Sequence, residues 1–404
     1  MENRLQECSQ KKISFKNVRI WNGLAESIDA GIDCLTFENG QVTSVGSSDE
    51  LGSDCQDYCQ DMSGLTLIPG LIDAHIHLCL NPEQKDPLAQ EDPGRDALLE
   101  QMSARARLML EAGITTARDL GGGQWLELEI RDRISRGEIP GPRLICSGQP
   151  ITSVKGHCHF WRGEARDVDE AIEVLDRQVE HQVDLIKVMA TGGNITKGSR
   201  PIDAQFDEVT LTKIVDKAES LGLHVAAHCH GTSGIRNAAR AGVTTIEHCS
   251  WVGDEGWGKS FDPEVMNTIA DKGVWVSPTI NSGWKRFMGN KSFEGMLQAN
   301  YAKMKEGGVK LIASTDAGIP NVMHHHLPLA IPVFAHFAQL TPVQVLRAAT
   351  SDCATAIGLG DVTGQIGVGY SADFLLFDGD PTVDLSVLVQ PLQVYKSGSA
   401  VLEK

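Results

Sequence analysis

The segment PGLIDAHIHL places two histidines, His75 and His77, two residues apart at the end of an apolar run. Residues two apart on a β-strand point to the same side, so both imidazoles face one way while Ile76 faces the other. Two neutral imidazole nitrogens on one face are suited to binding one divalent metal ion. An isolated His-x-His is more often a hydrogen-bonded polar pair, so the case for a metal depends on what ends the other strands.

Polar residues end several other apolar runs in the same way. HVAAHCH closes on His228 and His230, TTIEHC contains His248, and KLIASTDAG carries Asp316. We expect His228, deeper in its strand, and His248 to be metal ligands, and His230, at the turn, to contact the substrate. A carboxylate such as Asp316 can bind a metal and can also act as the catalytic group that moves a proton.

Lys187 lies within DLIKVMA, a run that is apolar on both sides of it. A bare ammonium group there has a large desolvation cost, so the amine must lose its proton, find a partner or extend to solvent. A neutral lysine amine can also take up carbon dioxide and become a carboxylate that bridges two metals. Beside the histidine and aspartate residues, we favour this carboxylated lysine over a lysine that extends to solvent.

Apolar runs that resemble strands carry these residues, and amphipathic stretches such as 166–181 and 207–221 lie between them. The eight runs are 71–78, 114–120, 143–148, 184–193, 224–230, 244–250, 274–279 and 310–318. Eight β/α repeats over roughly 290 residues predict an α/β chain with a (β/α)₈ TIM barrel over 70–361, whose functional side chains lie at the C-terminal ends of the strands. A doubly wound open sheet is the alternative, but no Gly-x-Gly-x-x-Gly follows a strand.

Short strand-like segments occur at both ends of the chain. FKNVRIW (15–21) and CLTFENGQVTSVG (34–46) lie near the start, with Glu38-Asn39-Gly40 at a hairpin turn, and YSADFLLF and LQVYKSGSAVL lie near the end. We therefore predict a small β-sandwich domain built from residues 1–69 and 362–404.

Composition excludes several classes of partner. The 404 residues contain 36 Lys+Arg and 53 Asp+Glu, for a net charge of −17, which argues against binding to nucleic acid or to an anionic membrane. The polar N-terminus and the absence of an apolar run of about 18 residues lead us to expect a cytoplasmic enzyme with a small-molecule substrate. The ten cysteines form no Cys-x-x-Cys pair, and we expect most of them to be reduced and buried.

Taken together, PGLIDAHIHL, Lys187, AAHCHG, TTIEHC, STDAG and IGVGYSADFLLFD resemble the amidohydrolase superfamily. The branch they resemble is the imidazolonepropionase-like group that contains Xaa-Pro dipeptidases and Xaa-Arg carboxypeptidases. The resemblance also implies a homo-oligomer, and it places His157, in SVKGHCHF, near the substrate.

The resemblance implies two divalent metal ions, which we expect to be zinc, although this donor set also accepts manganese, cobalt or iron. One ion would take His75, His77 and Asp316. The other would take His228 and His248, and carboxylated Lys187 and a hydroxide would bridge the two.

The implied reaction is hydrolysis of the amide bond of a dipeptide or an N-acyl amino acid. The bridging hydroxide attacks the carbonyl, and Asp316 passes its proton to the leaving nitrogen. The presence of Lys187, and of His228-Cys229-His230-Gly231 where deaminases have a glutamate, argues against deamination and imidazolone ring opening. Two alternatives stay open: an amidohydrolase of a cyclic amide, urea or carbamate, including a xenobiotic one, and a catalytically inactive scaffold.

Other residues after the strands are weaker candidates. We expect Arg118-Asp119 to form a structural ion pair, and the tryptophans in the connections to pack in the core rather than line a pocket. For three consecutive histidines two alternatives stay open, that at least one lines the pocket or that they form a solvated loop. Three cations could bind a substrate carboxylate, but we expect each to be an exposed loop or helix residue instead. These further residues are Trp125, Trp161 and Trp284, then His324, His325 and His326, then Lys197, Arg200 and Arg236.

Overall fold

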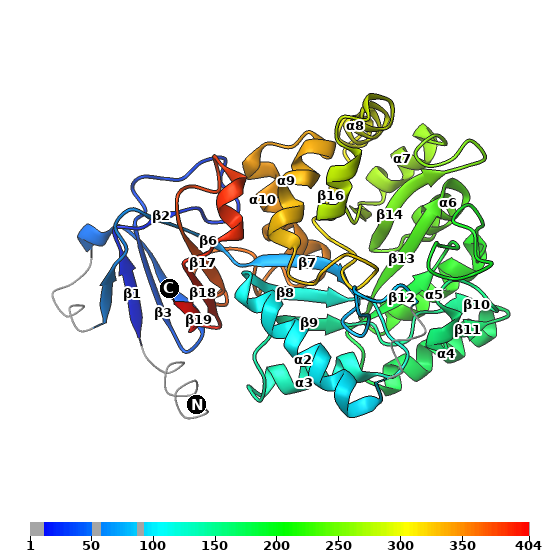
Figure 1. Cartoon of the computed structure of the whole chain (residues 1–404), viewed down its shortest axis with the longest axis horizontal. Coiled ribbons are helices and arrows are strands. Elements are labelled where there is room, and N and C mark those ends of the chain that lie inside the picture. Colours follow the sequence, from blue (N-terminus) through cyan, green and yellow to red (C-terminus); the bar gives the residue numbers. More distant parts are fainter. Residues whose placement is uncertain (1–11, 51–57, 87–92, 404) are drawn as a thin grey trace.

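The computed structural model describes residues 12–50, 58–86 and 93–403. Cys8 and Cys55, together with the parts of the predicted small domain at 1–11, 51–57 and 404, lie outside these ranges. Strands from both ends of the chain gather at one end of the molecule, and the alternating strands and helices form the other (Figure 1).

The eight predicted central strands are all present, in two parallel sheets ordered β7-β8-β9 and β12-β13-β14-β15-β16. Their bounds are β7 Leu71–Ile76, β8 Ile114–Asp119, β9 Arg143–Cys146, β12 Leu185–Met189, β13 His224–Gly231, β14 Thr245–Val252, β15 Trp275–Ser277 and β16 Lys310–Leu311. Most of their residues are buried on both faces, which explains why they read as continuous apolar runs.

Single bridges, and not continuous ladders, join the two sheets. Ile151, beyond the end of β9, forms a parallel bridge with Val188 of β12, and Ala317, beyond β16, forms one with Ile76 of β7. The backbone turns at both places, with a φ of 70° at Gly148 and 59° at Asp316, so the ladders stop early. The chain is therefore a mixed α/β fold whose eight strands form two adjoining sheets in place of one closed sheet.

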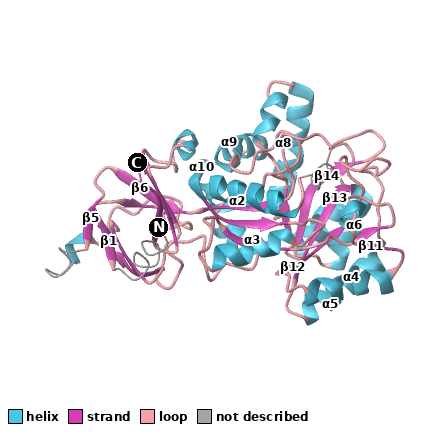
Figure 2. Ribbon diagram, turned by 60° about the horizontal axis from the view of Figure 1, so that its bottom comes forward, coloured by secondary structure: helices cyan, strands magenta, loops and turns pink. Residues whose placement is uncertain are grey.

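Helices connect these strands and lie outside them (Figure 2). They are α2 Arg95–Glu111, α3 Leu126–Ser135, α4 Val168–Glu180, α5 Glu208–Ser220, α6 Thr232–Ala241, α7 Pro263–Asp271, α8 Lys291–Glu306, α9 Leu327–Ala338, α10 Pro342–Ala348 and α11 Ser351–Ala356. The predicted helices at 166–181 and 207–221 are α4 and α5, and each begins where an aspartate, Asp167 or Asp207, accepts a backbone N–H of the first turn. In the described ranges no single helix is long and apolar enough to cross a membrane, and only the bent pair Leu327–Ala338 and Pro342–Ala356 passes by length and composition when taken together.

The strands near the chain ends form two further sheets, ordered β4-β3-β1-β5 and β19-β18-β17-β6-β2. Their bounds are β1 Ile13–Lys16, β2 Arg19–Ile20, β3 Cys34–Glu38, β4 Gln41–Gly46, β5 Cys59–Asp61, β6 Leu65–Pro69, β17 Phe374–Asp378, β18 Gln393–Lys396 and β19 Ser399–Glu403. The predicted turn joins β3 to β4, with φ values of 51° at Asn39 and 79° at Gly40. The single strand predicted at 15–21 is wrong: left-handed Asn17 (φ 58°) divides it into β1 and β2, which belong to different sheets.

An aromatic cluster of Phe15, Phe37, Phe374 and Tyr395 holds these two sheets together. Neighbouring ring centroids lie 4.9–5.8 Å apart, mostly edge to face. Successive side chains of β17 point to opposite faces and pack in different hydrophobic cores. Phe374 packs in this cluster, whereas Leu375 packs in the core of the α/β part. The boundaries at 1–69 with 362–404 and at 70–361 stay a prediction.

Replacing Phe374 by alanine removes a fully buried ring from the middle of the aromatic cluster. We expect Phe374→Ala to lower the free energy of unfolding by about 3–5 kcal/mol, because the cavity cannot close around the missing ring. Chemical denaturation would measure this change in the free energy of unfolding. The control is Val383→Ala, because the Val383 side chain is 75% exposed. Equal denaturation midpoints for the two variants would contradict the role of the cluster.

Candidate metal centre

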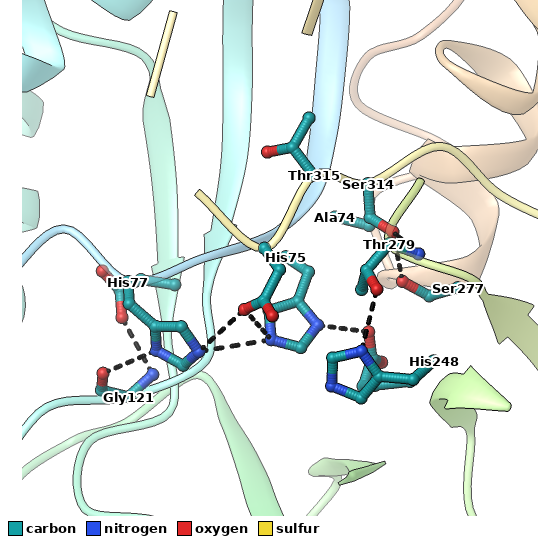
Figure 3. A network of polar contacts seen from close by, with 12 residues as sticks. Ala74, His75, His77, Gly121, His248, Ser277, Thr279, Ser314 and Thr315 are labelled. Atoms are coloured by element: carbon teal, nitrogen blue, oxygen red, sulfur yellow. Dashed lines mark hydrogen bonds and ion pairs between the residues drawn. The ribbon is translucent and has the colours of Figure 1, made fainter. Parts of the chain in front are cut away.

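His75, His77 and Asp316 converge at the C-terminal end of β7. The Nε2 atoms of the two histidines are 3.3 Å apart, and they lie 3.3 Å and 3.5 Å from Oδ1 of Asp316. Figure 3 shows a nitrogen of each ring directed toward the other ring, with His77 also turned toward Gly121. All three side chains are at least four-fifths buried.

The second nitrogen of each ring fixes its tautomer. His75 donates from Nδ1 to Oε2 of Glu247 at 2.9 Å, and His77 donates from Nδ1 to the carbonyl oxygen of Gly121 at 2.9 Å. A neutral imidazole has one proton, so both Nε2 atoms are left with free lone pairs. Burial lowers the pKa of His75 to about 4, which keeps the ring neutral at neutral pH. Two lone pairs and a carboxylate oxygen with no proton between them fit a metal cation.

A second group, His228, His230 and His248, lies beside the first. The three offer one nitrogen each within 4.8 Å of one another, and the His248 and His75 ring centroids are 5.2 Å apart. In Figure 3 His248 lies next to His75 and is bonded to Thr279, its Nδ1 being 2.8 Å from Oγ1. Burial lowers the pKa of all three histidines, to about 3 for His230, so each is a neutral potential ligand.

Lys187 lines the same cavity as both groups. Its side chain is fully buried, and its Nζ has no hydrogen-bond partner among the described residues. Burial lowers the pKa of the amine to about 8, so a substantial fraction is unprotonated near that pH. An unpaired, partly neutral amine is the form that carbon dioxide can modify.

A left-handed backbone brings neighbouring residues of β14 into the site together. On a regular strand Glu247 and His248 would point to opposite sides. The φ of 68° at His248 breaks this alternation, so both side chains contact His75. Asp316 is also left-handed, with a φ of 59°. Such strain at non-glycine residues costs of order 1–3 kcal/mol and is typical of functional sites.

Glu247 is a buried residue of the site that the motif spacing did not indicate. Its carboxylate accepts hydrogen bonds from Nδ1 of His75, from Nη2 of Arg118 at 2.7 Å and from Oγ1 of Thr245 at 2.5 Å. Burial would raise the pKa of Glu247, but the charge of Arg118 and the bond from His75 hold it well below its usual range. A signal was present in the sequence, because a glutamate inside an apolar strand needs a partner just as Lys187 does.

The ion pair predicted between Arg118 and Asp119 is wrong. The two are adjacent on β8 and therefore point to opposite sides of the strand. Arg118 donates to Glu247 and to the backbone oxygen of Ala74, whereas Asp119 accepts the backbone N–H groups of Leu78 and Gly121. Asp119 thus supports the loop whose carbonyl oxygen, at Gly121, orients His77.

Asp73, also missed, ties β7 to the segment that carries Asp316. It accepts the backbone N–H of His75 at 3.2 Å, and the N–H and hydroxyl of Thr315 at 3.1 Å and 2.5 Å. Burial raises the pKa of Asp73 to about 7. Its hydrogen bonds place His75 and Asp316 in a fixed relation.

A cavity of about 510 Å³ contains both groups, within the usual size range of ligand pockets. His157 lines it, with its ring centroid 4.5 Å from that of His228, and its Nδ1 has no hydrogen-bond partner within the described ranges. Trp284, expected in the core, also lines the cavity, as do Trp257 and Arg286, which were not predicted.

The weaker candidates lie elsewhere. Arg200 and Arg236 form ion pairs with Asp203 and Asp262, and neither they nor Lys197 are among the described residues that line the cavity. Trp161 packs on His77 and Trp125 stacks on His181, as expected of structural residues. From the histidine run, buried His324 bonds through Nε2 to the backbone oxygen of His77.

The family model for the amidohydrolase family matches residues 66–401, which cover most of the chain and both groups of potential ligands. The chain belongs to the amidohydrolase family. It is accordingly a hydrolase that acts on carbon–nitrogen bonds, in a family whose members are generally metal-dependent, and the resemblance seen in its motifs is confirmed.

Relatives and solved structures agree with this assignment. Ochratoxinase from Aspergillus niger is 26% identical to this amidohydrolase over 377 residues, covering 82% of this chain and 75% of that one. Imidazolonepropionase from Fusobacterium nucleatum is 24% identical over 414 residues, covering 92% and 91%. A solved Xaa-Pro dipeptidase with bound methionine superposes with a TM-score of 0.82 at 23% identity, covering 96% and 99%, which shows a shared fold.

The orienting role of Glu247 can be tested with Glu247→Gln. Loss of the carboxylate removes the acceptor that fixes the His75 tautomer, so we expect metal affinity to fall about 10- to 100-fold. Titration of the metal-loaded amidohydrolase with a chelator would measure the change, with circular dichroism to check folding. Glu138→Gln, on an exposed ion pair with Arg136, is the matched control. A folded variant with unchanged affinity would contradict this role.

Proposed function

We propose that this protein is a binuclear metal-dependent amidohydrolase that hydrolyses the amide bond of a dipeptide or an N-acyl amino acid. One observation carries the proposal. Two groups of potential ligands line one cavity together with the buried, unpaired amine of Lys187. The groups are His75, His77 and Asp316, and His228, His230 and His248.

In this proposal His75, His77 and Asp316 would hold one zinc ion and His228 and His248 the other, and carboxylated Lys187 would be a ligand shared by both. His230 is grouped with the second set by distance. We nevertheless assign it to the substrate, because its ring lies 4.8 Å from that of Trp257 on the cavity wall. His157, whose Nδ1 has no hydrogen-bond partner in the part of the chain that the structure describes, is the second substrate contact.

When bound, the two ions would polarise the amide carbonyl and lower the pKa of the attacking water. Asp316 takes the proton of that water and delivers it to the leaving nitrogen, which must be protonated to depart as an amine. For this role Asp316 must start as a carboxylate, the form in which its Oδ1, 3.3 Å and 3.5 Å from the Nε2 atoms of His75 and His77, can act as a metal ligand.

The two parallel sheets are, in this proposal, parts of one (β/α)₈ barrel. The backbone N–H of Asp316 bonds to the oxygen of His75, and the N–H of Asp184 bonds to that of Cys146, each at 2.9 Å across a junction between the sheets. The candidate ligands lie at the C-terminal ends of the strands, where such barrels place their active sites. The small β-sandwich domain, the homo-oligomer and the cytoplasmic location stay predictions.

Metal content and substrate range test the proposal directly. We expect elemental analysis to find about two divalent ions per chain, and the loaded protein to cleave dipeptides or N-acyl amino acids. Similarity to imidazolonepropionase favours a cyclic amide as the second candidate substrate, so imidazolone propionate belongs in the same screen. One ion per chain with cleavage of the cyclic amide alone would overturn the proposal. A protein that binds no metal and cleaves none of these substrates, even after incubation with metal and bicarbonate, would support the alternative of a catalytically inactive scaffold.

Asp316→Asn separates proton transfer from metal binding. The amide oxygen can still act as a ligand, but the side chain no longer accepts a proton. We expect turnover to fall about 100- to 10,000-fold while much of the metal is retained. Steady-state kinetics and elemental analysis would measure the two effects, with Asp361→Asn on the surface as the control. Unchanged turnover would remove Asp316 from the mechanism.

Lys187→Ala tests the bridging role. We expect the variant to hold about one ion per chain and to lose activity, because the bridging carboxylate is missing. Added formate or acetate should restore part of the metal content and part of the activity, since a small carboxylic acid can occupy the space left by the Lys187 side chain. Two tightly held ions in the variant without added acid would rule out the bridge.

A further inference from the structure

The lining of the cavity includes aromatic residues as well as the histidines. Its outer wall is formed by Trp257, Trp284, Phe287 and Phe293. Trp284, Phe287 and Phe293 make one continuous surface, with successive ring centroids 5.9 Å and 5.0 Å apart. Trp257 is 39% exposed, and its ring contacts that of His230, so apolar surface adjoins the histidines. Such a wall suits a bulky apolar or aromatic group on the substrate.

Arg286 lies at this wall, in the short helix η5 (Ser282–Phe287) that follows β15. Apart from Lys187, it is the only lysine or arginine among the described residues that line the cavity. Its guanidinium carbon is 4.5 Å from the centroid of the Phe287 ring, a cation–π contact.

Arg286 also has no ion-pair partner among the described carboxylates, although it is exposed and the chain has a net charge of −17. By contrast, the two arginines first considered for a substrate carboxylate, Arg200 and Arg236, are paired with Asp203 and Asp262. The donors of Arg286 are therefore available to a ligand. A guanidinium binds a carboxylate through two parallel N–H bonds, which a lysine cannot do.

We propose that Arg286 binds the free carboxylate of the substrate, and that the aromatic wall beside it selects substrates with a large apolar group. This inference rests on the proposed amide hydrolysis and narrows it. The substrate class is an N-acyl amino acid, or a dipeptide, with an unblocked carboxylate and an aromatic or bulky aliphatic group.

The test compares two substrates that differ only in their terminal group, a carboxylate in N-benzoyl-L-phenylalanine and a neutral carboxamide in N-benzoyl-L-phenylalaninamide. In Arg286→Gln we expect kcat/KM for the acid to fall about 10-fold, mainly through KM, while the value for the neutral amide changes less than about twofold. Arg286→Lys should give an intermediate loss, because it keeps the charge and loses the two-bond geometry. Lys285→Gln removes a charge from the same turn outside the cavity lining and should behave as wild type.

A binding measurement separates this inference from the reaction itself. The ketone 2-benzyl-4-oxo-4-phenylbutanoate replaces the amide nitrogen by carbon and cannot be hydrolysed. Its binding to the metal-loaded protein should change tryptophan fluorescence, because Trp257 and Trp284 line the cavity. We expect Arg286→Gln to weaken binding of this acid about 10-fold and to leave its carboxamide unaffected.

Each outcome decides one of the two proposals. Equal losses for the acid and the neutral amide, or an equal effect of Lys285→Gln, would overturn the carboxylate site while amide hydrolysis stands. Binding of the acid that depends on Arg286, without cleavage of any amide, would overturn the proposed reaction and keep the anion site.

Discussion

The buried pair of Arg118 and Glu247 is the interaction on which the candidate centre depends. It links β8 to β14 and places a full negative charge against His75. Removing two charges from water is unfavourable, and the pair is tolerated because Thr245 and the backbone oxygen of Ala74 satisfy further hydrogen-bonding groups. With Glu247 ionised, His75 carries its proton on Nδ1 and presents its other nitrogen to the cavity. The charge of one arginine therefore decides which atom of a histidine on another strand is available to a metal.

Backbone conformation makes the second contribution to the centre. Strand alternation alone aligns His75 with His77 and His228 with His230. Left-handed turns at His248 and Asp316 add ligands that alternation would have directed elsewhere. Most of the potential ligands thus come from regular strands, and the rest from the places where the strands end.

Much of this arrangement could be predicted from the sequence, because apolar runs and two-residue spacing are local properties. All eight central strands are present, and His75, His77 and Asp316 meet as expected. The partner of Arg118 could not be found in this way, since it depends on which strands become neighbours across the fold. Arg286 was missed because a substrate contact from an irregular segment has no periodicity, and its position becomes visible only with the cavity wall around it.

Side chains of strand β17 pack in two hydrophobic cores at once, and this affects how the chain folds while it is being synthesised. The strand pairs with β6, so residues 374–378 lie against residues 65–69, which are synthesised much earlier. Contacts between such distant segments close a very long loop and form late. Until β17 leaves the ribosome, the nascent chain exposes the apolar surfaces that Phe374 and Leu375 later cover. Synthesis of this enzyme therefore includes a period in which the chain carries exposed apolar surface, a state that is prone to aggregation.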